Sequence, residues 1–177
     1  MALSGRKAKL AIAEIDAMDP DAFVAALGAV AEHSPWVARE AWRRRPFGSI
    51  AGLQLAFQAA IRLAPRDRRV DLLCAHPELA GRESTGGELT DASAREQGAA
   101  RLDRLAPGEL AALRRLNAAY RERFGFPFVA CVGEHSLESL LAWGQARLGR
   151  DHEAEATTAL AEVGKIVDLR LSDLVNG

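Results

Sequence analysis

The chain has little of what marks several large classes of protein. It has only two cysteines, Cys74 and Cys131, which form no C-x-x-C pair and are too few for a disulfide framework. The 23 basic and 24 acidic residues nearly cancel, so no strong positive field is available to collect phosphate backbones. No run approaches the roughly 20 apolar residues of a membrane span, and Glu14 and Asp16 interrupt the N-terminal segment. These absences predict a cytoplasmic protein with no nucleic-acid or membrane partner.

Several catalytic motifs are also absent. The sequence contains no G-x-S-x-G, P-loop or G-x-G-x-x-G pattern, so serine-hydrolase, nucleotide-phosphate and dinucleotide chemistry have no support. What is present is an ordinary globular composition, with 49% apolar and 27% charged residues in 177. A chain of this length is expected to form a single domain over residues 1–177 and to bury roughly 70% of its unfolded surface.

Apolar residues recur at spacings of three and four, in segments rich in Ala, Leu, Arg and Glu. This pattern predicts an all-α, single-domain bundle of about eight helices joined by short irregular connectors. Ser49 and Asp67 are expected to cap two of the helices, and residues 81–90, with three glycines, are expected to form the longest loop. The expected helices cover about 20–32, 35–44, 49–63, 67–75, a segment starting near 93, 107–124, 136–148 and 151–175.

His76 is the first candidate for chemistry. It stands where a helix is expected to end before Pro77, and the dipole at a helix C-terminus favours an imidazolium with a pKa close to working pH. A helix-capping or core histidine is the alternative. Cys74 and Glu78 invite a zinc interpretation, but Cys-x-His-x-Glu across a helix end is no recognised ligand spacing, so no metal site is expected.

Glu96 is the second candidate. Together with Ser93 it matches the capping-box pattern, in which each side chain bonds the other residue's backbone amide. The functional alternative is that Glu96 holds the imidazole of His76 in one tautomer and stabilises its positive form. Ser93 and Gln97 would then be free to bind a ligand.

Arg170 is the third candidate, because it lies in an inward-facing stripe of the last helix. Val163, Ile166, Val167 and Leu174 occupy the same stripe at spacings of three and four. A guanidinium removed from water needs an anion to receive it. Two interpretations stay open, a structural buried ion pair and recognition of a substrate carboxylate.

Several segments resemble, in order and spacing, those of the 2-oxo-4-hydroxy-4-carboxy-5-ureidoimidazoline (OHCU) decarboxylase family. Among them, a His-Pro pair at 76–77 is followed by a Ser-x-x-Glu-Gln segment at 93–97. The match covers nearly the whole chain. The resembling segments are EHSPWVAREAW (32–42) with RRPF (44–47), HPELAGR (76–82), SAREQ (93–97), LNAAYRERFGFPFVACV (116–132) and EVGKIVDLRLSDLV (162–175).

The resemblance implies a cofactor-free enzyme of urate breakdown that converts OHCU to (S)-allantoin and carbon dioxide. It also implies an all-helical protein that is commonly a homodimer. The family's catalytic histidine corresponds to His76, its supporting acid to Glu96 and its substrate-binding arginine to Arg170. Further pocket positions and backbone contacts to the ring and ureido oxygens correspond to Pro77, Ser93, Gln97, Phe128, Val129, Ala130 and Cys131.

One departure from the family pattern is visible. After Glu96 and Gln97 the family usually carries a glycine-rich AGAG-like stretch, whereas this chain reads Gly98-Ala99-Ala100-Arg101. The catalytic positions are unaffected by this change.

The chemistry implied by the family agrees with these residues. Loss of carbon dioxide leaves an electron pair that the neighbouring imine of OHCU can receive, so no metal or organic cofactor is expected. Arg170 would anchor the carboxylate, His76 would move the proton, and Glu96 would orient His76. Two competing hypotheses are an enzyme of another ureido-carboxylate and a non-catalytic helical dimerisation domain.

Overall fold

The computed structural model describes residues 9–80 and 90–176, and within these ranges the chain is all α-helical, as predicted. Two short 3₁₀ turns, η1 (Gly28–Val30) and η2 (Val132–Glu134), interrupt the connectors, and an isolated parallel bridge joins Leu10 to Val175. The nine α-helices in the described part are α1 (Ile12–Ala17), α2 (Pro20–Leu27), α3 (Trp36–Trp42), α4 (Ile50–Leu63), α5 (Arg66–Ala75), α6 (Asp91–Ala99), α7 (Pro107–Phe124), α8 (Leu137–Leu148) and α9 (His152–Leu174).

Local sequence sets most helix ends. The side chain of Ser49 accepts a hydrogen bond from the amide of Gly52 at the start of α4, so its predicted capping role is confirmed. Helix α7 begins at Pro107, where the missing N–H has no consequence, and stops at Gly125, whose φ of 79° suits glycine. Helix α5 ends at Ala75 because the residue before Pro77 is driven to extended geometry.

Several helix boundaries differ from the sequence predictions, and one helix was not expected. The segment expected to be helical over 20–32 ends as α2 at Leu27 and continues as the 3₁₀ turn η1. Helix α5 starts one residue earlier than expected, so Asp67 lies in its first turn and does not cap it. Helix α6 starts at Asp91 with Thr90 as its cap. The ninth helix, α1, was not expected, and residues 81–89 of the expected loop lie outside the described residues.

Helix α6 ends in a motif that normally contains glycine. The amide of Leu102 donates to the carbonyl of Gln97 and the amide of Arg101 donates to that of Gly98, which is the Schellman pattern. Arg101 takes the left-handed position of this motif, with φ of 57°. A residue with a side chain costs about 1 to 2 kcal/mol in that conformation, which glycine adopts freely.

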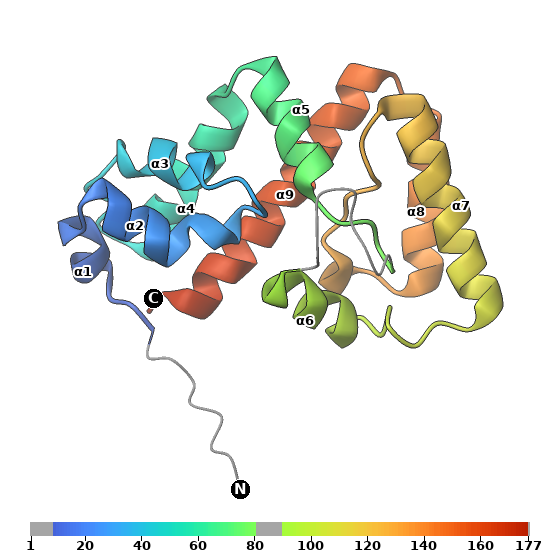
Figure 1. Cartoon of the computed structure of the whole chain (residues 1–177), viewed down its shortest axis with the longest axis horizontal. Helices are drawn as coiled ribbons and strands as arrows, with labels where there is room; N and C mark the ends of the chain where they lie inside the picture. The colour runs from blue at the N-terminus through green and yellow to red at the C-terminus, as the bar shows by residue number, and fades with distance from the viewer. Residues whose placement is uncertain (1–8, 81–89, 177) are drawn as a thin grey trace, which may run out of the picture.

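Helix α9 is the element on which the others assemble. In Figure 1 it runs diagonally across the molecule, between a group formed by α1 to α4 and another formed by α5 to α8. It packs against α4, α5 and η1, while α3 lies between α2 and α4, and α7 pairs with α8. Buried side chains of both groups join one hydrophobic core, which includes Phe23, Leu27, Phe57, Leu113, Tyr120, Phe126, Phe128, Val163, Val167 and Leu171.

A fully buried ion pair fixes the irregular connector between α7 and α8. Arg147 of α8 and Glu155 of α9 have no solvent exposure and approach to 2.5 Å. The hydroxyl of Tyr120 also donates to Glu155, and Nη1 of Arg147 donates to the carbonyl of Val129 at 3.1 Å. The pair therefore holds the connector residues that line the candidate site. In the described part of the chain, no helix combines the length and apolarity needed to cross a bilayer.

Candidate functional site

A cavity of about 540 Å³ opens where α6, α9, the connector after α7 and the segment after α5 meet. All ten residues singled out from the sequence line this one cavity, although they come from four separate parts of the chain. They are His76, Pro77, Ser93, Glu96, Gln97, Phe128, Val129, Ala130, Cys131 and Arg170. Leu79, Arg101, His135, Ile166 and Leu169 are among the further lining residues.

The position of His76 determines which of its nitrogens carries the proton. Its Nδ1 lies 2.8 Å from the carbonyl oxygen of Leu72, one turn back in α5. A carbonyl only accepts hydrogen bonds, so Nδ1 holds the proton and Nε2 holds a lone pair. Nε2 is buried and has no hydrogen-bond partner among the described residues. The ring is therefore set up as a base at the edge of the cavity.

The charge state of His76 follows from its burial. Burial lowers the pKa of His76, and although the Leu72 carbonyl and Glu32 act in the opposite direction, the pKa stays below its usual 6.5. Removal of the side chain from water has the largest effect, and it outweighs the contacts that favour the imidazolium. At neutral pH the imidazole is uncharged.

The guanidinium of Arg170 makes five hydrogen bonds within the protein. Nε and Nη2 donate to the two carboxylate oxygens of Glu96 at 2.7 and 2.8 Å. Nη1 donates to Glu32 at 2.7 Å and to the carbonyl of Val30 at 3.2 Å, and Nη2 also donates to the Ser93 hydroxyl at 3.0 Å. A guanidinium has five N–H groups, so all of them have protein acceptors. Of the two interpretations left open by the sequence, this geometry favours the structural ion pair.

These contacts exclude the capping box at the start of α6. The hydroxyl of Ser93 donates to Glu32 at 2.6 Å, and the carboxylate of Glu96 is engaged by Arg170. Neither side chain caps the N-terminus of α6, which is capped by Thr90. Glu96 makes no hydrogen bond to His76 either, because Nδ1 of His76 bonds to the Leu72 carbonyl and Nε2 has no partner in the described structure. The imidazole is thus oriented by backbone and not by Glu96.

Two carboxylates and one guanidinium leave this cluster with a net charge of about −1. Glu32 is fully buried. Burial alone would raise the pKa of Glu32, but the Ser93 hydrogen bond and Arg170 outweigh it and hold the pKa below its usual value. Burial would lower the pKa of Arg170, and the two glutamates reverse this effect and raise it. Glu32 and Arg170 are therefore both charged at neutral pH.

The segment that follows His76 is held by two side-chain amides. Oε1 of Gln97 accepts from the amide of Ala80 at 2.8 Å. Nδ2 of Asn117, on α7, donates to the carbonyl of Leu79 at 3.0 Å. Gln97 lines the cavity, whereas Asn117 lies behind the segment and is not part of the lining. These contacts fix the backbone that carries His76 and Pro77.

The zinc interpretation of the 74–78 segment has no geometric support. The thiol of Cys74 donates to the carbonyl of Gly125, and Glu78 forms an ion pair with Arg121. Neither group is aimed at His76. Within the described residues, these side chains do not form a cluster with metal-ligand distances.

Four connector residues predicted to contribute backbone contacts line the cavity, and the amide of one of them is already in use. The amide of Cys131 donates to Oε2 of Glu162 at 2.9 Å and is therefore occupied. The amides of Phe128, Val129 and Ala130 have no hydrogen-bond partner among the described residues. Burial, followed by the nearby Glu134, raises the pKa of the Cys131 thiol to about 11, so the thiol stays protonated.

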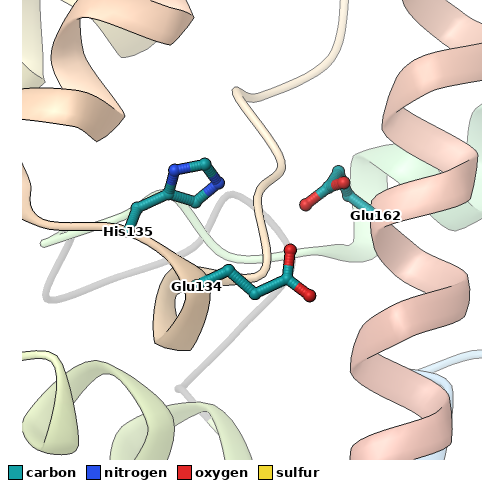
Figure 2. A group of neighbouring side chains, drawn as sticks. All are labelled: Glu134, His135 and Glu162. Carbon is teal, nitrogen blue, oxygen red and sulfur yellow. The ribbon is translucent and has the colours of Figure 1, made fainter.

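Glu134, His135 and Glu162 form another group of potential ligands beside the cavity. Figure 2 shows the imidazole of His135 and the carboxylate of Glu162 on opposite sides, with the carboxylate of Glu134 below and between them. Their donor atoms lie within 4.8 Å of one another. The ammonium of Lys165 lies 2.7 Å from Glu134 and 2.9 Å from Glu162, and these hydrogen bonds raise its pKa. Lys165 already supplies the positive charge that these carboxylates need.

Comparison with known proteins identifies the family. A family model described as OHCU decarboxylase matches residues 16–172. The chain belongs to the OHCU decarboxylase family. The resemblance noted in the sequence is therefore confirmed.

Relatives within the OHCU decarboxylase family match this chain over most of its length. An OHCU decarboxylase of Haloferax volcanii is 41% identical over 165 residues, which cover 93% of this chain and 96% of that protein. One from Mus musculus is 40% identical over 162 residues, covering 92% and 91%. A crystal structure of (S)-allantoin synthase has a TM-score of 0.72 at 27% identity and covers 94% of this chain and 54% of that chain.

Sequence reasoning missed three parts of this OHCU decarboxylase site. Glu32 begins one of the segments that resemble the family, but nothing in the sequence marks it as the second anion of Arg170. Asn117 and the carbonyl of Leu72 were also missed. A polar residue in the middle of an apolar helix face was the available signal for Asn117, which is 2% exposed. No sequence signal points to Leu72, because its contribution is a backbone atom.

Proposed function

We propose that the protein catalyses the cofactor-free decarboxylation of OHCU to (S)-allantoin and carbon dioxide, a step of urate breakdown. Membership of the OHCU decarboxylase family supports this substrate, as does the likeness to a structure named (S)-allantoin synthase. The observation that carries the mechanism is the buried Nε2 of His76 at the edge of the cavity, which has no hydrogen-bond partner in the part of the chain that the structure describes.

The reaction needs little from the protein beyond orientation and proton transfer. As the bond to the carboxylate breaks, its electron pair forms a ring C=C bond and the imine nitrogen takes a proton from solvent. Carbon dioxide leaves, and the ring hydroxyl is now an enol. Nε2 of His76 removes the hydroxyl proton and delivers it to the adjacent carbon, so that the hydroxyl becomes the carbonyl of allantoin. Protonation from one face yields one enantiomer.

The charged cluster acts in this proposal through the residues that it holds. Arg170 fixes the carboxylate of Glu96 with two hydrogen bonds, so Glu96 presents a rigid acceptor to substrate N–H groups. Free amides of Phe128, Val129 and Ala130 donate to the ring and ureido oxygens. Arg170 is a positioning residue here, because its own donors are in use. This replaces the direct carboxylate anchor expected from the sequence.

A homodimer in the cytoplasm is proposed as the working form, with residues 1–177 as one domain. The resemblance to the family supports the dimer, and the composition supports the compartment. Light scattering after size-exclusion chromatography measures the oligomeric state, and cell fractionation measures the location. A monomer at the concentration of the assay would remove the dimer from the proposal and leave the reaction intact.

The decisive experiment follows circular dichroism after OHCU is generated freshly from urate. The wild-type protein is expected to produce one allantoin enantiomer faster than spontaneous decay. His76→Asn keeps a donor for the Leu72 carbonyl but removes the base, and its rate is expected to fall about 100-fold or more. His33→Asn makes the same change at an exposed site and is expected to behave as wild type.

Two outcomes would overturn the proposal. Racemic allantoin formed at the spontaneous rate would favour an enzyme of another ureido-carboxylate or a non-catalytic dimerisation domain. Full activity in His76→Asn would retain the substrate but remove the proposed base.

A further inference from the structure

Among the described residues that line the cavity, the guanidinium of Arg101 is a cation whose donors have no protein acceptor. Charged side chains that line it come from Glu96, Arg101 and Arg170, and His76 is neutral. Arg170 is saturated by protein acceptors, and together with Glu32 and Glu96 it leaves a local charge of about −1. Arg101 has no side-chain hydrogen bond or ion pair among the described residues. A substrate that carries a carboxylate would be repelled by the cluster unless Arg101 offsets that charge.

The backbone at Arg101 indicates that packing alone does not account for this residue. It occupies the left-handed position of the Schellman motif that ends α6, where glycine is the favoured residue. Its side chain is exposed, so burial of its methylene groups does not compensate for the unfavourable conformation. The next residue, Leu102, is buried and provides the packing of the motif. An arginine at this position places a guanidinium at the rim of the cavity.

We propose that Arg101 is a further substrate-binding residue, which receives the carboxylate of the substrate at the rim of the cavity. This inference rests on the proposed function for the identity of the substrate. A planar guanidinium binds a carboxylate with two parallel hydrogen bonds. Because Arg101 is exposed, it stabilises the bound carboxylate less than a buried cation would, and so opposes its loss less strongly. Carbon dioxide formed at the rim leaves directly to solvent.

The variant Arg101→Gly separates binding from folding, because glycine fits the left-handed backbone. Its KM for OHCU is expected to rise about tenfold with kcat changed less than twofold. Wild-type kcat/KM is expected to fall as ionic strength rises, and this dependence is expected to weaken in the variant. The melting temperature is expected to stay equal or rise. A structural role would instead lower the melting temperature and leave KM unchanged.

Arg104→Gln is the matched control. It removes one positive charge three residues away, from a side chain that is exposed and does not line the cavity. Its KM is expected to match wild type, and Arg101→Lys is expected to restore part of the affinity lost in Arg101→Gly. An equal rise of KM in Arg104→Gln, or no rise in Arg101→Gly, would overturn the assignment.

A binding measurement keeps this test independent of turnover. Calorimetry would compare allantoate, which carries a carboxylate and ureido groups, with allantoin, which has no carboxylate. Arg101→Gly is expected to weaken allantoate binding about tenfold and to leave allantoin binding within twofold of wild type. His76→Asn, which fails in catalysis, is expected to bind allantoate normally. Equal binding of allantoate by wild type and Arg101→Gly would overturn the proposal, whether or not OHCU is turned over.

Discussion

Arg170 and Glu32 are separated by 138 positions in the sequence, yet Nη1 of one lies 2.7 Å from Oε2 of the other. This ion pair joins the C-terminal part of α9 to the segment between η1 and α3. Both side chains are buried, and the Ser93 hydroxyl links the pair to α6. The residues that shape the cavity therefore also hold three parts of the fold together.

Replacing Glu32, the second anionic partner of Arg170, tests how much this carboxylate contributes to stability. Glu32→Gln keeps the shape of the side chain and removes its charge, so Arg170 loses one of two anionic partners. The free energy of unfolding is expected to fall by about 2 kcal/mol in urea denaturation. Glu40→Gln, at an exposed carboxylate paired with Arg43, is the control and is expected to change stability by less than about 0.5 kcal/mol. Equal effects of the two substitutions would contradict a buried, strongly paired Glu32.

The lowered pKa of His76 predicts the shape of the pH profile. The neutral ring is the active base, and burial keeps it neutral below the usual value of 6.5. The rate constant kcat/KM is expected to stay flat from about pH 8 down past 6.5 and to fall only at more acidic pH. The circular dichroism assay across this pH range measures kcat/KM, and NMR titration of the ring protons measures the pKa of His76. A midpoint at or above 6.5 would contradict a lowered pKa of His76.

Acid should also weaken folding through the same groups. Both Glu32 and His76 have lower pKa values in the folded protein, so the unfolded chain binds more protons. Their stabilising contribution is complete above the unfolded values of 4.5 and 6.5 and is lost as pH falls through the lower folded values. Melting temperatures are expected to decline below about pH 6.5 with a shallower slope in His76→Asn. Identical slopes in the two proteins would be inconsistent with a depressed His76 pKa.

Asn117 is expected to act on catalysis through the backbone behind His76. Asn117→Ala removes the donor to the Leu79 carbonyl, and kcat is expected to fall about tenfold because the histidine is less well placed. The stability loss is expected to be about 1 kcal/mol. Gln54→Ala removes an amide that joins α4 to α9 away from the cavity. It should lose similar stability with normal kcat, and a similar loss of kcat in both variants would assign Asn117 a purely structural role.

The buried pair of Arg147 and Glu155 should behave differently from the pair at the site. Glu155→Leu alone leaves an unpaired buried guanidinium and is expected to lower stability by about 3 to 5 kcal/mol. The double variant with Arg147→Met removes both charges and is expected to recover much of this loss. Urea denaturation of the single and double variants measures the coupling. If the double variant were less stable than Glu155→Leu, the unpaired charge would not be the cause.

The sequence alone determined the features that depend on neighbours a few positions away. Helices followed from apolar residues three and four apart, and their ends from Pro77, Ser49 and Gly125, because backbone geometry and capping are local. The same spacing placed Arg170 on the buried face of α9. Motifs in register identified the family and, through it, every residue that lines the cavity and was singled out in advance.

Tertiary structure decided how those residues are used. The capping box predicted at Ser93 does not form, because Ser93 bonds to Glu32 and Glu96 bonds to Arg170, both from distant parts of the chain. The proton position on His76 depends on a backbone carbonyl, and its pKa depends on burial by helices that sequence cannot orient. The position of Arg101 at the rim of the cavity likewise depends on how α6 packs against the rest of the protein. Hydrogen bonding and desolvation act through space, so these properties became definite only when the helices assembled.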